Sequence, residues 1–192
     1  MQITTILGSP RLSGNTATIL KSFEESALTG NRINRINIKE QSVKGCLGCL
    51  ACQKKQDVPG CIQKDDADKI FEEIINSDLV IYASPVYVWD FTAQMKSLLD
   101  RQCCFVKWEN KKNPVSLLKE KKVMLLATCG GDAESNADLI KEIFKREMEY
   151  LQCNIIGMYI APNCTTPSSL GNMPRIIAQE MINDLKIKKF LN

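Results

Sequence analysis

Four cysteines stand close together in one segment of this chain, at Cys46, Cys49, Cys52 and Cys61. Two residues separate Cys46 from Cys49, and two separate Cys49 from Cys52. Thiolates in such a run can ligate an iron–sulfur cluster or a zinc ion, and they can also remain as thiols or form disulfides. The spacing alone leaves these alternatives open, so the rest of the sequence must discriminate among them.

A second segment has the composition of a phosphate-binding loop. Residues 8–16 read Gly-Ser-Pro-Arg-Leu-Ser-Gly-Asn-Thr and lead from an apolar run into a helical pattern. Backbone N–H groups at a helix N-terminus attract anions, and hydroxyl and guanidinium groups add hydrogen bonds and charge. The pattern is neither a Walker motif nor a GxGxxG fingerprint, and a simple helix cap is the alternative. The candidate phosphate ligands are Ser9, Arg11, Ser13, Asn15 and Thr16.

The segment over residues 84–91 is apolar and aromatic, although most loops are polar. This composition favours contact with a flat apolar group. Packing against the following helix is the alternative for the later aromatic residues. The candidate ligand contacts are Pro85, Val86, Tyr87 and Trp89.

A third candidate loop covers residues 128–131, which read Thr-Cys-Gly-Gly. Two adjacent glycines allow the backbone to approach a bound molecule closely, or simply to turn sharply. We therefore add Thr128, Gly130 and Gly131 to the candidate site.

Strands and helices are expected to alternate along the chain. Apolar runs bounded by turn residues predict strands at 3–7, 33–38, 79–83, 123–127 and 155–160. Apolar residues at three- and four-residue intervals predict helices at 15–28, 66–76, 91–105, 137–151 and 174–190. The turn-rich residues 110–114 read as a surface loop. Strands that are apolar on both faces predict an α/β fold, a three-layer doubly wound sheet of five parallel strands in the order 2-1-3-4-5.

Such a sheet would bring the candidate loops together. Ligands of open parallel sheets bind beyond the carboxyl ends of the strands, where the strand order reverses. The loops after the first, third and fourth strands should therefore converge there. The cysteine segment follows the second strand, so we expect its thiols to lie near the same ligand.

Length and composition predict one globular domain over residues 1–192, with 44% hydrophobic and 24% charged residues. The net charge of +3 is spread along the chain and is too weak to indicate nucleic-acid binding. The sequence shows no leader and no membrane-spanning run, and its many cysteines suit a reducing compartment, so a cytoplasmic location is expected. The remaining cysteines are expected mainly to pack in the interior: Cys103, Cys104, Cys129, Cys153 and Cys164.

Two groups of residues resemble the NAD(P)H-dependent FMN reductase family. They are Gly8-Ser9-Pro10-Arg11 with Asn15-Thr16, and Ser84-Pro85-Val86-Tyr87 followed by Ala-Gln-Met-Lys-Ser-Leu-Leu-Asp-Arg at 93–101. The resemblance covers about residues 1–132. It implies a flavodoxin-like fold that binds FMN, with the phosphate on the first loop and the ring against residues 85–87 and 128–131. It also implies a homodimer or homotetramer.

The cysteine segment is similar to that of the iron–sulfur flavoprotein branch of this family, which implies a [4Fe-4S] cluster on Cys46, Cys49, Cys52 and Cys61. Eight residues, 53–60, separate the last two cysteines, which is longer than the pattern of that branch. Flavin-only relatives also retain cysteines before a segment like Lys64-Asp65-Asp66. A cluster, a zinc ion and free thiols therefore remain alternatives.

The expected function is an FMN-dependent oxidoreductase that takes hydride from NADH or NADPH and reduces a small-molecule or protein acceptor. No catalytic side chain is expected, because hydride transfer requires alignment rather than a general base, and the chain contains no histidine. Backbone N–H groups of residues 86–87 and 129–131 are expected to stabilise charge on the reduced ring. The alternatives are an electron carrier with an iron–sulfur cluster and a thiol-based sensor without FMN.

Overall fold

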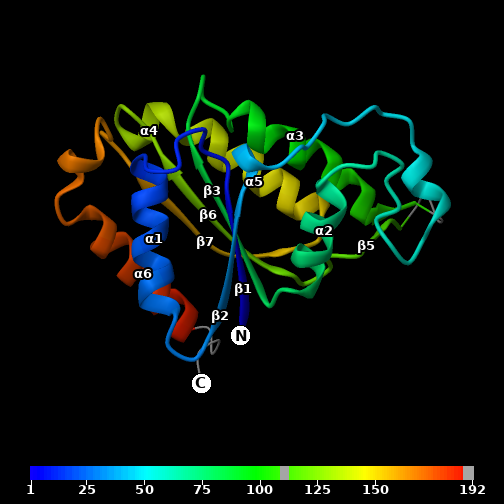
Figure 1. Ribbon diagram of the computed structural model, residues 1–192, viewed down its shortest axis with the longest axis horizontal. Helices are drawn as coiled ribbons and strands as arrows, with labels where there is room; N and C mark the ends of the chain where they lie inside the picture. Colours follow the sequence, from blue (N-terminus) through cyan, green and yellow to red (C-terminus); the bar gives the residue numbers. More distant parts are fainter. Residues whose placement is uncertain (109–112, 188–192) are drawn as a thin grey trace.

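A computed structural model describes residues 1–108 and 113–187 of the protein. Its central sheet has five parallel strands in the order β2-β1-β3-β6-β7 (Figure 1). This confirms the predicted α/β class and the order 2-1-3-4-5. The strands are β1 (Gln2–Leu7), β2 (Arg32–Asn37), β3 (Leu79–Pro85), β6 (Lys122–Thr128) and β7 (Asn154–Ala161).

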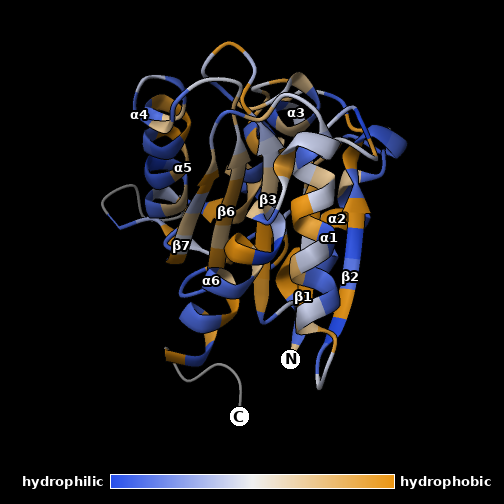
Figure 2. Cartoon of the chain, turned by 90° about the vertical axis from the view of Figure 1, so that its left-hand side faces the viewer, coloured by the Kyte–Doolittle hydropathy of each residue, from blue (hydrophilic) through white to orange (hydrophobic). Residues whose placement is uncertain are grey.

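Helices cover both faces of the sheet. One face packs against α1 (Asn15–Ala27) and α6 (Met173–Ile187), and the other packs against α2 (Ala67–Asn76), α3 (Ala93–Arg101) and α5 (Asp138–Tyr150). Successive residues of β3 enter opposite hydrophobic clusters, with Val80 and Tyr82 on one side and Leu79 and Ile81 on the other. Burial on both faces explains why the strands read as continuous apolar runs. Figure 2 shows these apolar strands between the helices, with a more polar β2 at the edge.

Several short elements were not predicted from the sequence. Strands β4 (Val106–Lys107) and β5 (Val115–Ser116) form a separate antiparallel pair, and the short helix α4 (Ala133–Asn136) precedes α5. Segments of two to four residues show no hydrophobic periodicity, so pattern analysis misses them. Within residues 1–108 and 113–187 there are also four 3₁₀ turns: η1 (Ile38–Glu40), η2 (Ala51–Lys54), η3 (Gln102–Phe105) and η4 (Pro167–Leu170).

The helix predicted over 91–105 is shorter in the structure. Thr92 caps its start by accepting a hydrogen bond from the Met95 N–H, and the chain changes to the η3 turn after Arg101. The predicted loop at 110–114 and the end of the helix predicted over 174–190 lie partly outside the described residues, at 110–112 and 188–190. Within the part that is described, no helix has the length and apolarity needed to cross a bilayer.

The loop after β1 packs directly against the start of α3 at Gly8. Its N–H donates to the Ala83 carbonyl at 2.8 Å, and its carbonyl accepts from Thr92 Oγ1 at 2.5 Å. A Cβ at this position would lie 2.7 Å from Met95 Cβ, which is closer than side chains tolerate. Gly8 is therefore required for the close approach of the first loop and the third helix.

We predict that Gly8→Ala lowers the free energy of unfolding by roughly 1–3 kcal/mol, because the added methyl group forces Met95 or the loop backbone to move. Gly45→Ala is the matched control, since a Cβ there meets nothing within 4 Å. Its effect should stay within roughly 0.5 kcal/mol. Urea denaturation of the two variants and the wild type measures both values, and equal stabilities would contradict the packing argument.

Candidate active site

The candidate loops meet around a cavity of about 600 Å³ beyond the carboxyl ends of the strands. All of the predicted cofactor residues except Trp89 and Gly131 line it. The lining from the predicted loops comprises Ser9, Pro10, Arg11, Leu12, Ser13, Gly14, Asn15, Thr16, Pro85, Val86, Tyr87, Thr128, Cys129 and Gly130. The convergence expected from the strand order is therefore present.

The first loop presents hydrogen-bond donors to one end of the cavity. Ser9 Oγ accepts from the Arg11 N–H at 3.1 Å and donates to the Arg11 carbonyl at 3.0 Å, which fixes the turn. Gly14 is the N-cap of α1 and supplies no side-chain cap, and the first turn contains no acidic residue. The first N–H groups of α1 are thus available to an anion. In the alternative of a helix capped by a side chain, the cap would use one of these N–H groups.

Asn15 carries an orphaned polar atom at this end of the cavity. Its Oδ1 is buried and has no hydrogen-bond partner within the described chain. A buried polar atom without a partner is rare and indicates a missing ligand or water. The two ends of a carboxamide have nearly the same shape, so the same position can present Nδ2 as a donor to an anion. The residues present therefore fit a phosphate group.

The two sides of the cavity are joined by a buried hydrogen bond between Thr16 and Thr128. Their Oγ1 atoms lie 2.7 Å apart, and both residues line the cavity. This bond fixes the start of α1 relative to the end of β6. One of the two hydroxyl groups donates its hydrogen to the other. The accepting hydroxyl group keeps its own hydrogen and can still donate it to a ligand.

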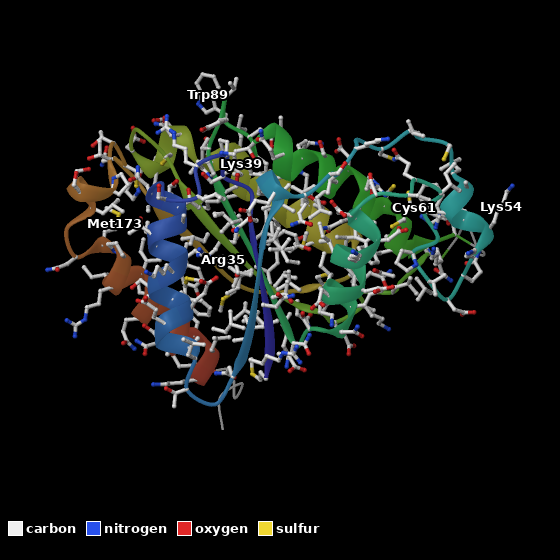
Figure 3. The ribbon with its side chains drawn as sticks, in the orientation of Figure 1. Arg35, Lys39, Lys54, Cys61, Trp89 and Met173 are labelled. Atoms are coloured by element: carbon white, nitrogen blue, oxygen red, sulfur yellow. The ribbon has the colours of Figure 1, made fainter. Side chains whose placement is uncertain are left out.

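The apolar side of the cavity ends in a tight turn from Tyr87 to Asp90. The two residues exchange backbone hydrogen bonds, and the central residues Val88 and Trp89 have φ angles of 51° and 63°. A left-handed conformation is unusual for a β-branched residue and costs of order 1–3 kcal/mol. Trp89 is half-exposed and does not line the cavity; its Nε1 donates to the Ser135 carbonyl, in α4, at 3.0 Å, and Figure 3 shows it at the top of the molecule. Contact of Trp89 with a ligand stays a prediction.

Most of the backbone amides expected to face the ring have partners within the chain. The N–H groups of Val86, Tyr87 and Cys129 donate to the carbonyls of Thr128, Asp90 and Ala161, at 2.8–3.0 Å. The expectation that these three amides stabilise charge on a ligand is wrong, because strand and turn pairing uses them. Those of Gly130 and Gly131 have no acceptor among the described residues.

Four lining residues lie outside the predicted loops: Lys39, Cys164, Thr165 and Pro167. Lys39 follows β2 and adds a second cation beside the first loop, while Cys164 donates its N–H to the Cys129 carbonyl at 2.8 Å. Burial raises the pKa of Cys129, and burial together with Cys129 raises that of Cys164 to about 11. Both side chains are neutral thiols at pH 7. The positions of Cys129 and Cys164 after strand ends were the one feature of the sequence from which their place in the cavity could have been predicted.

The cysteine segment forms a separate site. Cys46, Cys49, Cys52 and Cys61 line a small cavity of about 40 Å³ with Cys103 and Cys104. This cavity shares no lining residue with the larger one, and Cys61 and Lys54 lie far to one side of Lys39 (Figure 3). Within one copy of the chain these thiols therefore line a different cavity from the predicted cofactor residues, and their nearness to a bound ligand stays a prediction. Cys103 and Cys104 are more than packing residues, because they complete the wall of this second cavity.

A buried ion pair anchors the cysteine segment to α3. Arg101 Nη1 lies 2.6 Å from both carboxylate oxygens of Asp65, and Arg101 Nη2 donates to Cys61 Sγ at 3.4 Å. The two side chains are 0% and 3% exposed. Burial opposes ionisation of Asp65, but hydrogen bonds from Arg101 and from the amides of Lys44 and Ala67 together lower its pKa below the usual value. The guanidinium also lies over the Phe71 ring, at 5.7 Å from its centroid.

Within the described residues, no group of three or more ligating side chains is close enough to hold a metal ion. The cysteine segment has the thiolates that an iron–sulfur cluster or zinc requires, in type and in number. The arrangement in the structure, however, is not that of a preformed metal site.

The model of one protein family, described as NADPH-dependent FMN reductase, matches residues 1–152. The chain belongs to this family. An iron–sulfur flavoprotein of Archaeoglobus fulgidus is 38% identical over 53% of this chain and 45% of its own length. One from Methanocaldococcus jannaschii is 32% identical over 72% of this chain and 66% of its own length. The chain thus spans about half to two thirds of these relatives.

Solved structures support the fold of this FMN reductase family member. An FMN-dependent NADH-azoreductase from Bacillus anthracis, solved in complex with FMN, superimposes with a TM-score of 0.69 over 95% of this chain and 99% of that chain. Its sequence is 15% identical, so the likeness establishes the flavodoxin-like fold alone. Together with the family match, it confirms the resemblance seen in the sequence.

We predict that Asp65→Ala lowers the free energy of unfolding by about 3–5 kcal/mol, because it leaves the buried Arg101 charge unpaired. Asp68→Ala is the control. Asp68 pairs with Lys64 at the surface, so its loss should cost under about 1 kcal/mol. Because the pKa of Asp65 is lowered in the folded state, the contribution of this carboxylate is full above a pH of about 4 and declines as the pH falls further. Chemical denaturation at pH 7 and in acid measures both effects, and equal losses at pH 7 in the two variants would refute the anchor.

Proposed function

We propose that the protein is an FMN-dependent NAD(P)H oxidoreductase. The observation that carries this proposal is the two-part character of the large cavity. One end has the helix N-terminus, the hydroxyl groups, Arg11 and the unpartnered Asn15 amide, and the other end has the apolar residues 85–87. A ligand with a phosphate at one end and a flat ring at the other complements both.

The residues of the chain act by binding and positioning. Ser9, Arg11, Ser13, Asn15 and Thr16, together with the first N–H groups of α1, would hold the phosphate. Pro85, Val86 and Tyr87 would lie against the ring and exclude water from one side. Thr128 and the amide of Gly130 would face its polar edge. Bound FMN would accept hydride from the nicotinamide and pass electrons to a second acceptor.

No side chain of the cavity needs to act as an acid or a base. Hydride transfer depends on the alignment of donor and acceptor atoms. The neutral thiols of Cys129 and Cys164 add no negative charge to the lining, whereas Arg11 and Lys39 give the end of the cavity at the first loop positive charge. That charge favours an anionic phosphate.

The direct test is an anaerobic purification followed by a visible spectrum, with FMN added if none is retained. Oxidation of NADH and of NADPH is then followed with a quinone, an azo dye and a ferric complex as acceptors. Flavin binding with turnover of either nicotinamide supports the proposal. A chain that neither retains FMN nor binds it when added would overturn it and favour the sensor alternative.

We predict that Arg11→Gln weakens FMN binding about tenfold or more, since a hydrogen bond to a charged group is worth about 1.5–3 kcal/mol. Riboflavin, which lacks the phosphate, should bind the variant and the wild type equally. Lys21→Gln removes the same charge from an exposed position on α1 and should leave both affinities unchanged. Fluorescence quenching titrations measure all the values, and an equal loss of riboflavin affinity would place Arg11 elsewhere than at the phosphate.

A second candidate function is electron transfer through an iron–sulfur cluster on Cys46, Cys49, Cys52 and Cys61. The gathering of these thiols around one cavity and the names of the two archaeal relatives favour it. Reconstitution with ferrous iron and sulfide, followed by metal and sulfide analysis, tests this candidate. Stoichiometric iron and sulfide that are lost in Cys49→Ser but retained in Cys153→Ser would support the cluster. Binding of zinc alone, or of no metal, would exclude it.

We also propose that the protein works in the cytoplasm as a homodimer or homotetramer. The nine cysteines of the chain are free thiols, which suits a reducing compartment. Light scattering coupled to size-exclusion chromatography measures the oligomeric state, and a mass of one chain, 21.6 kDa, would refute the assembly.

A further inference from the structure

Two cysteines from distant parts of the chain meet at the edge of the small cavity. Cys46 Sγ, in the segment after β2, lies 3.9 Å from Cys103 Sγ, in the η3 turn after α3. Cys46 is exposed and Cys103 is half-buried. The sulfur atoms are not bonded, but they are neighbours across 57 residues of sequence.

The backbone on the Cys103 side is fixed. The η3 turn, which contains Cys103, continues directly from α3. The next two residues of the turn, Cys104 and Phe105, are buried in the hydrophobic core. The segment on the Cys46 side is held just before the cysteine, where the Lys44 N–H donates to Asp65 Oδ2 at 3.0 Å. The buried ion pair of Asp65 with Arg101 thus holds the two cysteines next to each other.

The backbone around Cys46 can move the short distance that a bond requires. A disulfide needs sulfur atoms about 2 Å apart, so the pair must close by about the same amount. Gly45 and Gly48 lie on either side of the cysteine, and a Cβ at either position would meet nothing within 4 Å. Each makes one side-chain contact, from Gln63 Nε2 to the Gly45 carbonyl and from the Gly48 N–H to Cys46 Sγ. The residues Leu47 and Leu50 are exposed and do not pack in the core. We expect rotation of the Cys46 side chain with a small loop shift to bring the sulfur atoms together.

We propose that Cys46 and Cys103 form a reversible disulfide, a modification site that is separate from the FMN cavity. The Cys46 thiolate attacks a low-molecular-weight disulfide such as oxidised glutathione, forms a mixed disulfide and releases one glutathione thiol. The Cys103 thiolate then attacks the Cys46 sulfur and releases the second glutathione thiol. The protein loses two electrons and two protons, and the glutathione disulfide is reduced to two thiols.

The disulfide would close the cysteine segment onto the end of α3. It would also remove Cys46 from any set of four thiolates, so that a metal or cluster on Cys46, Cys49, Cys52 and Cys61 could form in the reduced chain and not in the oxidised one. The FMN cavity contains none of these cysteines, so FMN binding is expected to be the same in both forms.

The test uses the full chain, freed of metal by a chelator and kept anaerobic, in glutathione buffers of increasing oxidised fraction. Intact mass should fall by two hydrogen atoms, and peptide mapping without reduction should recover one linked pair that contains Cys46 and Cys103. Cys103→Ser should abolish this product. Cys49→Ser removes an exposed thiol from the same segment and should retain it. Near-ultraviolet circular dichroism shows that each variant is folded.

A wild-type chain that stays fully reduced in the most oxidising buffer would overturn the inference. So would a map in which Cys46 is linked mainly to Cys52 or Cys61, or in which it carries only glutathione. Measurement of FMN affinity on the same samples separates this inference from the proposed function. A linked pair in a chain that binds FMN in neither the reduced nor the oxidised form refutes the enzyme and not the disulfide, and FMN binding without a linked pair refutes the disulfide and not the enzyme.

Discussion

A parallel sheet that is buried on both faces can present polar groups to a ligand only at the ends of its strands, and the rest of the structure depends on this constraint. Every crossover returns the chain to the end of the sheet where the strands begin, so all five strands finish at the opposite end. The first, third and fourth strands of the sheet therefore deliver their loops to one place. The candidate phosphate-binding loop, the apolar wall and the glycine turn meet there because each lies directly after a buried strand.

Close packing at the strand ends then determines the shape of the cavity. The contact of Gly8 with Met95 sets the first loop against α3, and the hydroxyl pair of Thr16 and Thr128 joins the first loop to the end of β6. The left-handed turn at Val88 and Trp89 gives the apolar side an abrupt end. Backbone strain of this kind tends to occur at ligand sites, where the surrounding structure enforces it.

A second, independent constraint controls the cysteine segment. The buried ion pair of Asp65 and Arg101 stabilises the fold only as a pair, since either charge alone would be costly to bury. It holds the segment to the end of α3, and it brings Cys46 beside Cys103. Two separate groups of thiols result. Cys129 and Cys164 line the large cavity as neutral thiols, whereas Cys46, Cys49, Cys52, Cys61, Cys103 and Cys104 line the small cavity.

The sequence by itself determined the fold class, the strand order and most of the large cavity, because apolar periodicity and loop composition are local properties that the sheet topology then combines. It could not place Trp89, which bonds to Ser135, nor Lys39 and Cys164, which reach the cavity from the second and fifth strands of the sheet. It also could not show that the amides of residues 86, 87 and 129 are used within the chain. Only the tertiary structure decided where the cysteine segment lies, because the ion pair that holds it joins residues 36 positions apart in the sequence. Interactions over such separations depend on the packing of whole helices and leave no pattern in the neighbouring residues.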